Sequence, residues 1–243
     1  MEYKAYSFDL DDNLLKLPTK VFLEDAKGNL KEFSTLNFEK IRPQMKKLGF
    51  KTNSNSFKSF EDNKQFLKDI EKATLAGSWK NIETCLVKHA SIFAIITARR
   101  HNPETLKQGI KRAILKNFSK EQLEKFSKKF IEKYSIKKIG NQKFSEKILD
   151  QYLELCKFYP VNNPEIKKQF NSEDTSELKS FAFADFQKYI NNHVKENFGA
   201  ETKIKIGFSD DSITHLNKMI NEILKEHGLF FYQTKNKGKT LLS

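Results

Sequence analysis

The sequence predicts an α/β protein built on a doubly wound parallel sheet, and three observations support this prediction. Segments with strand-like patterns alternate with segments of helical periodicity along the 243 residues. Ser91 to Ile96 (SIFAII) is almost wholly apolar, as expected for a central strand that is covered on both faces. Polar clusters follow three of the predicted strands, and in parallel sheets the reactive site lies beyond the carboxyl ends of the strands.

The N-terminal third begins with a short strand from Lys4 to Phe8, which is followed directly by an acidic cluster. A hairpin is predicted next, because Val21 to Leu23 and Leu30 to Phe33 flank Lys27-Gly28-Asn29, a turn sequence whose glycine can adopt positive φ. From Phe57 to Leu86, apolar residues recur mostly every three or four positions, which indicates amphipathic helices.

The middle of the chain contains a well-marked helix start, where Asn102 can cap the helix and Pro103 can occupy its first position. Residues 120–155 have a mostly helical pattern, with room for a short strand from Tyr134 to Ile139. Lys157 to Val161 predicts an edge strand, since it contains a proline, which the centre of a sheet does not tolerate.

The C-terminal part continues the alternation. Asp174 and Glu177 resemble a capping box for a helix that runs to about Val194. Lys203 to Phe208 alternates like a strand, a helix follows from Leu216 to Leu224, and Leu229 to Tyr232 predicts a last strand before a frayed polar tail.

The long stretch between the first and second polar clusters predicts an insertion. We expect a Rossmann-like core formed by residues 1–16 and 83–243, and a cap formed by a hairpin and helices over residues 17–82. A second helical insertion is expected at about residues 117–150. Caps of this kind exclude water from a site and select its substrate.

Composition limits the possible partners. The formal net charge is +13, but only four of the 44 basic residues are Arg, so we favour a generally cationic surface over a functional basic groove. The 22 Phe residues are interpreted as core, not as a platform for stacking bases. Two cysteines without metal-ligand spacing, and no signal peptide or membrane-spanning run, predict a cytoplasmic protein without a membrane partner.

The polar clusters resemble motifs of the haloacid-dehalogenase (HAD) superfamily. Phe8-Asp9-Leu10-Asp11 resembles its first motif, an apolar strand followed by Asp-x-Asp, and Ile95-Ile96-Thr97 resembles the second. Gly207-Phe208-Ser209-Asp210-Asp211 resembles the fourth, an apolar strand ending in paired acids. The order and spacing fit from about Tyr3 to Tyr232, and three motifs in order are far more specific than Asp-x-Asp alone.

The resemblance implies a Mg²⁺-dependent phosphomonoester hydrolase with an aspartyl-phosphate intermediate on Asp9. Asp11 would protonate the leaving oxygen and then activate water, while Thr97 would donate its hydroxyl to a phosphoryl oxygen. Asp9, the Asp11 carbonyl and Asp210 would hold the metal, with Asp211 close behind. This chemistry is sound, because a carboxylate attacking a dianion needs its charge offset, and Mg²⁺ prefers oxygen ligands.

The resemblance also calls for a lysine, and several are available. We favour Lys179, just inside the helix that begins at Asp174, over Lys188, which lies later in the same helix. Arg99 and Arg100 closely follow the second motif, at the predicted mouth of the site, and one of them, Arg99 in preference, could bind substrate phosphate.

Two neighbouring positions are less clear. Asn13 stands where the family usually has Thr or Val, although its amide can still form hydrogen bonds within the loop. Asp12 has either a turn-stabilising role or a direct one.

Three functions remain open. The leading hypothesis is a phosphatase for a phosphorylated small molecule. The positive charge suggests a second, a phosphatase for polynucleotide ends, and a third is a non-catalytic basic nucleic-acid-binding protein on the same fold.

Overall fold

The computed structural model describes residues 1–134, 144–223, 228–235 and 238–242. Their centre is a six-stranded sheet in the order β10-β9-β8-β1-β6-β7. All neighbouring strands in it run parallel except β10, which pairs antiparallel with β9 at one edge. The strands are β1 (Glu2–Phe8), β6 (Phe93–Thr97), β7 (Lys157–Pro160), β8 (Lys203–Asp210), β9 (Leu229–Lys235) and β10 (Gly238–Leu241).

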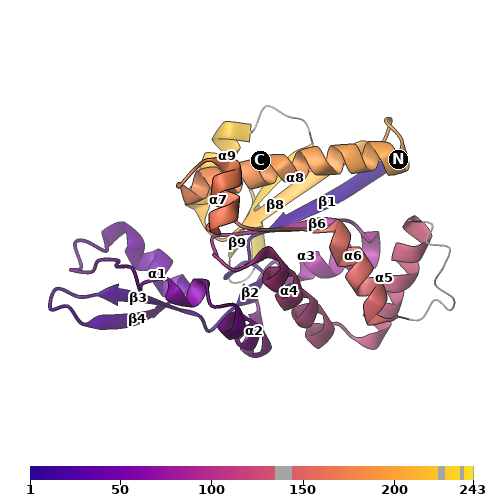
Figure 1. The fold of residues 1–243 in the computed structure, drawn as a ribbon. Coiled ribbons are helices and arrows are strands. Elements are labelled where there is room, and N and C mark those ends of the chain that lie inside the picture. Colours follow the sequence, from indigo (N-terminus) through magenta and orange to yellow (C-terminus); the bar gives the residue numbers. More distant parts are fainter. Residues whose placement is uncertain (135–143, 224–227, 236–237, 243) are drawn as a thin grey trace.

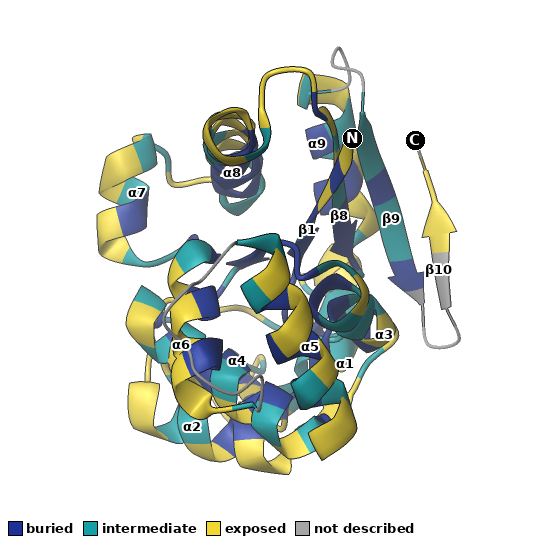
Figure 2. Cartoon of the chain, turned by 90° about the vertical axis from the view of Figure 1, so that its right-hand side faces the viewer, coloured by how far each residue is buried: buried dark blue, intermediate teal, exposed yellow. Residues whose placement is uncertain are grey.

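Helices cover both faces of this sheet, so the prediction of an α/β protein with a mostly parallel sheet flanked by helices is confirmed (Figure 1). One face is covered by α8 (Thr175–Phe198) and α9 (Ile213–Ile223), with α7 (Pro164–Phe170) nearby. The other is covered by α3 (Trp79–Glu83), η3 (Thr84–His89), α4 (Pro103–Asn117), α5 (Lys120–Lys133) and α6 (Glu146–Leu155). Every residue of β6 is buried, as its apolar run predicted, and the exposed faces of the helices point outward (Figure 2).

Capping residues fix where α4 and α8 begin, the two helices that follow strand β6 and carry Lys179, respectively. The Asn102 side chain caps α4 by accepting a hydrogen bond from the Glu104 amide, and Pro103 is the first helical residue. Asp174 caps α8 by accepting from the Glu177 amide at 2.8 Å. The predicted capping box is only half formed, because the Glu177 carboxylate instead accepts from Ser172.

The insertion begins and ends at a two-stranded ribbon, β2 (Leu15–Lys16) paired antiparallel with β5 (Thr74–Leu75). Between them lies the predicted hairpin, with Gly28 at φ +83° in its turn. The hairpin and α1 enclose a small separate core. The elements here are β3 (Lys20–Glu24), β4 (Leu30–Ser34), α1 (Thr35–Ile41), η1 (Arg42–Gln44) and η2 (Lys58–Phe60). Residues 20–60 are called the cap below.

The rest of the predicted insertion packs against the main core. In α2 (Asn63–Lys72), Phe66 is fully buried, and it contacts α4 so closely at Gly109 that a Cβ there would lie 2.5 Å from its ring. Trp79 of α3 is also part of the main core. The second predicted insertion likewise contributes core residues from α5 and α6. The short strand predicted at Tyr134 to Ile139 lies outside the described residues, apart from Tyr134.

The C-terminal prediction was wrong in one respect. The strands do not end at Tyr232, because β9 continues to Lys235, and Gly238–Leu241 forms β10, which pairs with it. Among the described residues, none of the helices is both long and apolar enough to cross a membrane.

Candidate active site at the carboxyl edge of the sheet

The register of the central strands brings the three polar clusters to one edge of the sheet. Phe8 of β1 lies opposite Ile95 of β6 on one side and Ser209 of β8 on the other. Asp9 follows directly, and its amide donates to the Ser209 carbonyl at 2.8 Å. Thr97 and Asp210 therefore end their strands within two residues of the same level as Asp9.

Three acidic side chains meet at this edge. Asp9, Asp210 and Asp211 each offer a carboxylate oxygen, and these oxygens lie within 4.8 Å of one another. Asp9 and Asp210 are buried, while Asp211 is partly exposed. Such a set of hard oxygen donors suits Mg²⁺, which binds proteins through a few carboxylates and keeps several waters.

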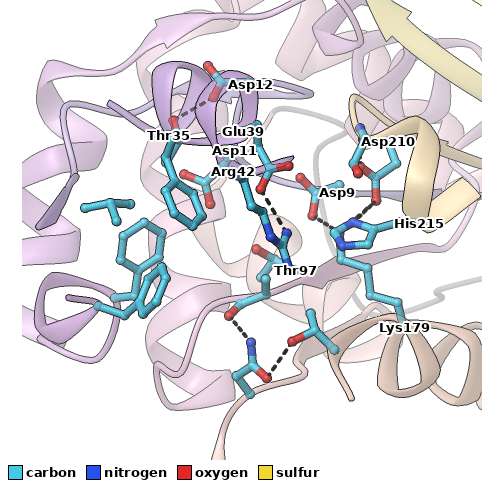
Figure 3. A pocket seen from close by; sticks show the side chains of 18 of the residues that line it. Asp9, Asp11, Asp12, Thr35, Glu39, Arg42, Thr97, Lys179, Asp210 and His215 are labelled. Carbon is cyan, nitrogen blue, oxygen red and sulfur yellow. Dashed lines mark hydrogen bonds and ion pairs between the residues drawn. The ribbon is translucent and has the colours of Figure 1, made fainter. Parts of the chain in front are cut away.

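Lys179 lies between two of these carboxylates, as Figure 3 shows. Its Nζ donates to Asp9 Oδ1 at 2.8 Å and to Asp210 Oδ2 at 2.7 Å, and only 2% of its side chain is exposed. His215 of α9 lies beside it, with Nδ1 at 3.2 Å from Nζ. An ammonium group can only donate, so all three of its N–H groups have acceptors when His215 Nδ1 is unprotonated.

Burial and charge determine the protonation of this cluster. Burial raises the pKa of Asp211 to about 9, and Asp210 and Asp9 add to the effect. Burial also raises the pKa of Asp9 well above its usual value, because Lys179 offsets only part of the cost. Burial disfavours the charged form of Asp210, but the Lys179 ammonium offsets it, and the pKa of Asp210 lies below its usual range. Burial thus favours the protonated forms of Asp9 and Asp211 when no metal is bound, and a divalent cation would offset the negative charge that appears when they ionise.

Arg99 does not lie at the mouth of the site, so the preference for Arg99 over Arg100 as a substrate ligand is not supported. Its side chain is fully buried, and Nε and Nη2 donate to the two oxygens of Asp11 at 2.8 and 2.7 Å. Nη2 also donates to Thr19 at 2.9 Å, and Nη1 lies 3.1 Å from His101 Nε2. Every side of the guanidinium is therefore engaged within the protein. Its role is to hold Asp11.

The two unusual positions after Asp11 both form contacts beyond their own loop. The Asn13 amide donates toward the Asp9 carbonyl at 2.8 Å and toward the Ser209 carbonyl at 3.0 Å, and its Oδ1 accepts from Thr234 at 2.6 Å. Asn13 thus joins the ends of β1, β8 and β9. Asp12 has φ +55°, as a turn residue can, and it accepts a hydrogen bond from Thr35 of the cap at 2.6 Å.

The cluster opens into a cavity of about 490 Å³ between the sheet edge and the cap. Asp9, Asp11, Thr97, Lys179, Asp210 and Asp211 line one end of it. Arg100, not Arg99, is the arginine of this loop that lines the cavity. Cap residues line the other end: Val21, Thr35, Phe38, Glu39, Arg42, Met45, Thr52, Phe57 and Phe60.

Sequence reasoning missed His215 and the cap residues of the cavity. His215 lies in the first turn of α9, five residues after Asp210, and the helical pattern after a polar strand end was the available signal. Nothing in the cap sequence distinguishes a Phe that faces the cavity from one that faces the cap core. Lys188, the alternative lysine, is exposed on α8 and does not line the cavity.

Fold and site together define an α/β protein that groups acidic side chains and one lysine at the carboxyl edge of a mostly parallel sheet. No protein-family model matches the chain, and no curated protein or solved structure matches it either.

Proposed function

We propose that the protein is a Mg²⁺-dependent phosphomonoester hydrolase of the HAD type, in which Asp9 accepts the phosphoryl group. The observation that carries the proposal is the grouping of Asp9, Asp210 and Asp211 around one position, with Lys179 bonded to two of them. A buried site with an excess of carboxylates is unfavourable by itself, and it suits a ligand that brings a divalent cation.

The residues fit Mg²⁺ by their chemistry. Asp9, Asp210 and Asp211 would hold it, together with the Asp11 carbonyl if the HAD pattern applies. When bound, Mg²⁺ would offset the negative charge of both the carboxylates and the phosphate and would orient the phosphoryl group.

The residues of the chain would share the reaction in two steps. An Asp9 oxygen attacks phosphorus, the bond from phosphorus to the leaving oxygen breaks, and Asp11 gives that oxygen a proton. A water then attacks the aspartyl phosphate, its proton passes to Asp11, and the bond between Asp9 and phosphorus breaks to release inorganic phosphate. Lys179 would keep the Asp9 oxygens in position throughout, and the Thr97 hydroxyl would donate to the phosphoryl group.

Arg99 adds a condition to this scheme. Both oxygens of Asp11 accept hydrogen bonds from Arg99, so a proton on Asp11 must share the carboxyl group with two N–H donors. For Asp11 to act as the acid, one of these two hydrogen bonds must open. As the later base, Asp11 starts from the arrangement in which both of its oxygens accept from Arg99.

The test is hydrolysis of an aryl phosphate by the wild type with Mg²⁺, by the wild type with EDTA, and by Asp9→Asn. Turnover that needs Mg²⁺ and is lost in Asp9→Asn supports the proposal, and acid quenching should leave a phosphorylated peptide that contains Asp9. Asp150→Asn is the matched control, because Asp150 pairs with Lys111 on the surface and should not affect turnover. Full activity of Asp9→Asn would refute the assignment.

A further inference from the structure

The cap end of the cavity has a different character from the sheet end. Three Phe rings form a continuous wall there. The Phe57 ring lies edge-on to Phe38, with centroids 5.5 Å apart, and edge-on to Phe60, with centroids 5.9 Å apart. Val21 and Met45 extend this apolar lining. The three Phe residues line the same cavity as the carboxylates, so one bound molecule can contact both groups.

Some of the polar groups near this wall bond to other residues of the chain. The Thr35 hydroxyl donates to Asp12 at 2.6 Å, and Arg42 donates to Glu39 at 3.2 Å. A sugar placed against these rings would bring several hydroxyls to an apolar surface that offers them no hydrogen-bond partner. Each buried polar group left without a partner costs about 1–3 kcal/mol, which disfavours a sugar phosphate.

The cations at the rim are also paired. Arg100 forms an ion pair with Glu61 at 3.5 Å, and Lys167 forms one with Glu173. A polynucleotide is bound mainly through a row of Lys and Arg side chains that neutralise its successive phosphates. These paired side chains therefore favour a small substrate with a single phosphate over a nucleic-acid end.

We infer, resting on the phosphatase function proposed above, that the substrate is a small phosphomonoester whose organic part carries an aromatic ring. The phosphate lies at the carboxylate cluster, and the ring packs against Phe38, Phe57 and Phe60 in the offset or edge-to-face arrangements that aromatic rings prefer. The cavity volume of about 490 Å³ falls within the range of sites for small molecules.

The test measures binding, so that it does not depend on turnover. Asp9→Asn protein with Mg²⁺ is titrated by calorimetry with 1-naphthyl phosphate, with glycerol phosphate and with a 5′-phosphorylated oligonucleotide. The naphthyl compound should bind at least tenfold tighter than glycerol phosphate, which corresponds to about 1.4 kcal/mol. In the same background, Phe57→Ala and Phe57→Leu should bring the ratio of the two dissociation constants toward one.

Phe50→Leu is the matched control. Phe50 belongs to the same cap core and lies edge-on to Phe33, but it does not line the cavity, so the ratio should stay unchanged. Phe57→Leu keeps most of the apolar volume of the side chain. If Phe57→Ala disturbs the fold of the cap, the affinity ratio of Phe57→Leu is the one that tests the inference.

Three results would overturn the inference: equal affinity for the two small phosphates, equal effects at Phe50 and Phe57, or tightest binding of the oligonucleotide. The wild type is tested separately for hydrolysis of the two small phosphates. If the wild type hydrolyses neither compound, the result counts against the phosphatase function. The affinity ratio would still decide whether the cap binds aromatic rings.

Discussion

Replacing Lys179 with Met tests whether this lysine balances the buried carboxylates. Lys179 is 2% exposed and forms ion pairs of 2.8 and 2.7 Å with Asp9 and Asp210. Removing one partner of a buried pair costs about 3–5 kcal/mol, since it leaves uncompensated charge in the interior. Asp9, whose pKa is already raised, can take up a proton in response, so we expect the loss near the lower end, about 3 kcal/mol, without metal.

Urea unfolding in EDTA measures this loss. The fluorescence of Trp79 reports it directly, because Trp79 is the single Trp of the chain and is 2% exposed in the folded protein. For a protein of this size, about 3 kcal/mol also corresponds to a fall of roughly 6–12 °C in melting temperature. Mg²⁺ should stabilise Lys179→Met more than the wild type, since a divalent cation compensates the same carboxylates.

Lys188→Met is the control for this prediction. Lys188 lies on the same helix and is exposed, so its replacement should change stability by less than about 0.5 kcal/mol. If Lys179→Met unfolds at the same urea concentration as Lys188→Met, the buried charge is balanced in some other way, and the reasoning about the site is wrong.

Three further predictions concern Asp211, Arg99 and Asn13. Burial raises the pKa of Asp211 to about 9, so the metal-free protein should lose stability as pH rises from about 4 to 9, while Mg²⁺ binds more tightly as pH rises, by up to about tenfold per unit. Calorimetry checks the metal affinity, and Asp211→Asn should weaken its pH dependence and leave the part due to Asp9, whose pKa is also raised. Arg99→Lys cannot form both hydrogen bonds to the Asp11 carboxylate, so it should lower kcat by about a hundredfold, the scale of acid–base catalysis. The Mg²⁺ affinity should stay nearly unchanged. An unaltered kcat would argue that the contact between Arg99 and Asp11 has no role in turnover. Asn13→Ala should cost about 2–3 kcal/mol in urea unfolding, because the buried hydrogen bonds of Asn13 with the Asp9 carbonyl, the Ser209 carbonyl and the Thr234 hydroxyl are lost. A loss below about 0.5 kcal/mol would contradict this.

The edge of the sheet could be predicted from the sequence because its signals are local. The run that ends at Phe8, the run that ends at Thr97 and the alternation that ends at Phe208 each mark a buried strand, and the residues after them must emerge at the same edge of a parallel sheet. Lys179 could be predicted for a similar reason. Its helix begins at a recognisable cap, Asp174, so its distance from the sheet edge is fixed by helix geometry.

Arg99 shows where local reasoning stops. A residue just after a strand end can point into solvent or back into the protein, and neighbouring residues do not decide which. Here the direction is set by Asp11, far away in the sequence, and by the rings of Phe60 and Phe66, which lie 4.8 and 5.1 Å from the guanidinium carbon. A fully buried Arg is stable only because all of these partners are present, and they come together only in the folded chain.

Arg99 and Asp12 connect the site to the cap. Sequence reasoning had placed Arg99 at the substrate and had given Asp12 either a turn-stabilising role or a direct one. Asp12 accepts a hydrogen bond from Thr35 at the start of α1, and Arg99 joins Asp11 to Thr19 and stacks on Phe60. Asp11 and Asp12 belong to the loop that begins at the proposed nucleophile. The position of the cap and the orientation of the proposed acid and base are therefore not independent. A substitution in the cap that moves Thr35 or Phe60 acts on Asp11 through these contacts, so it should change kcat as well as KM, even though it touches no reacting atom.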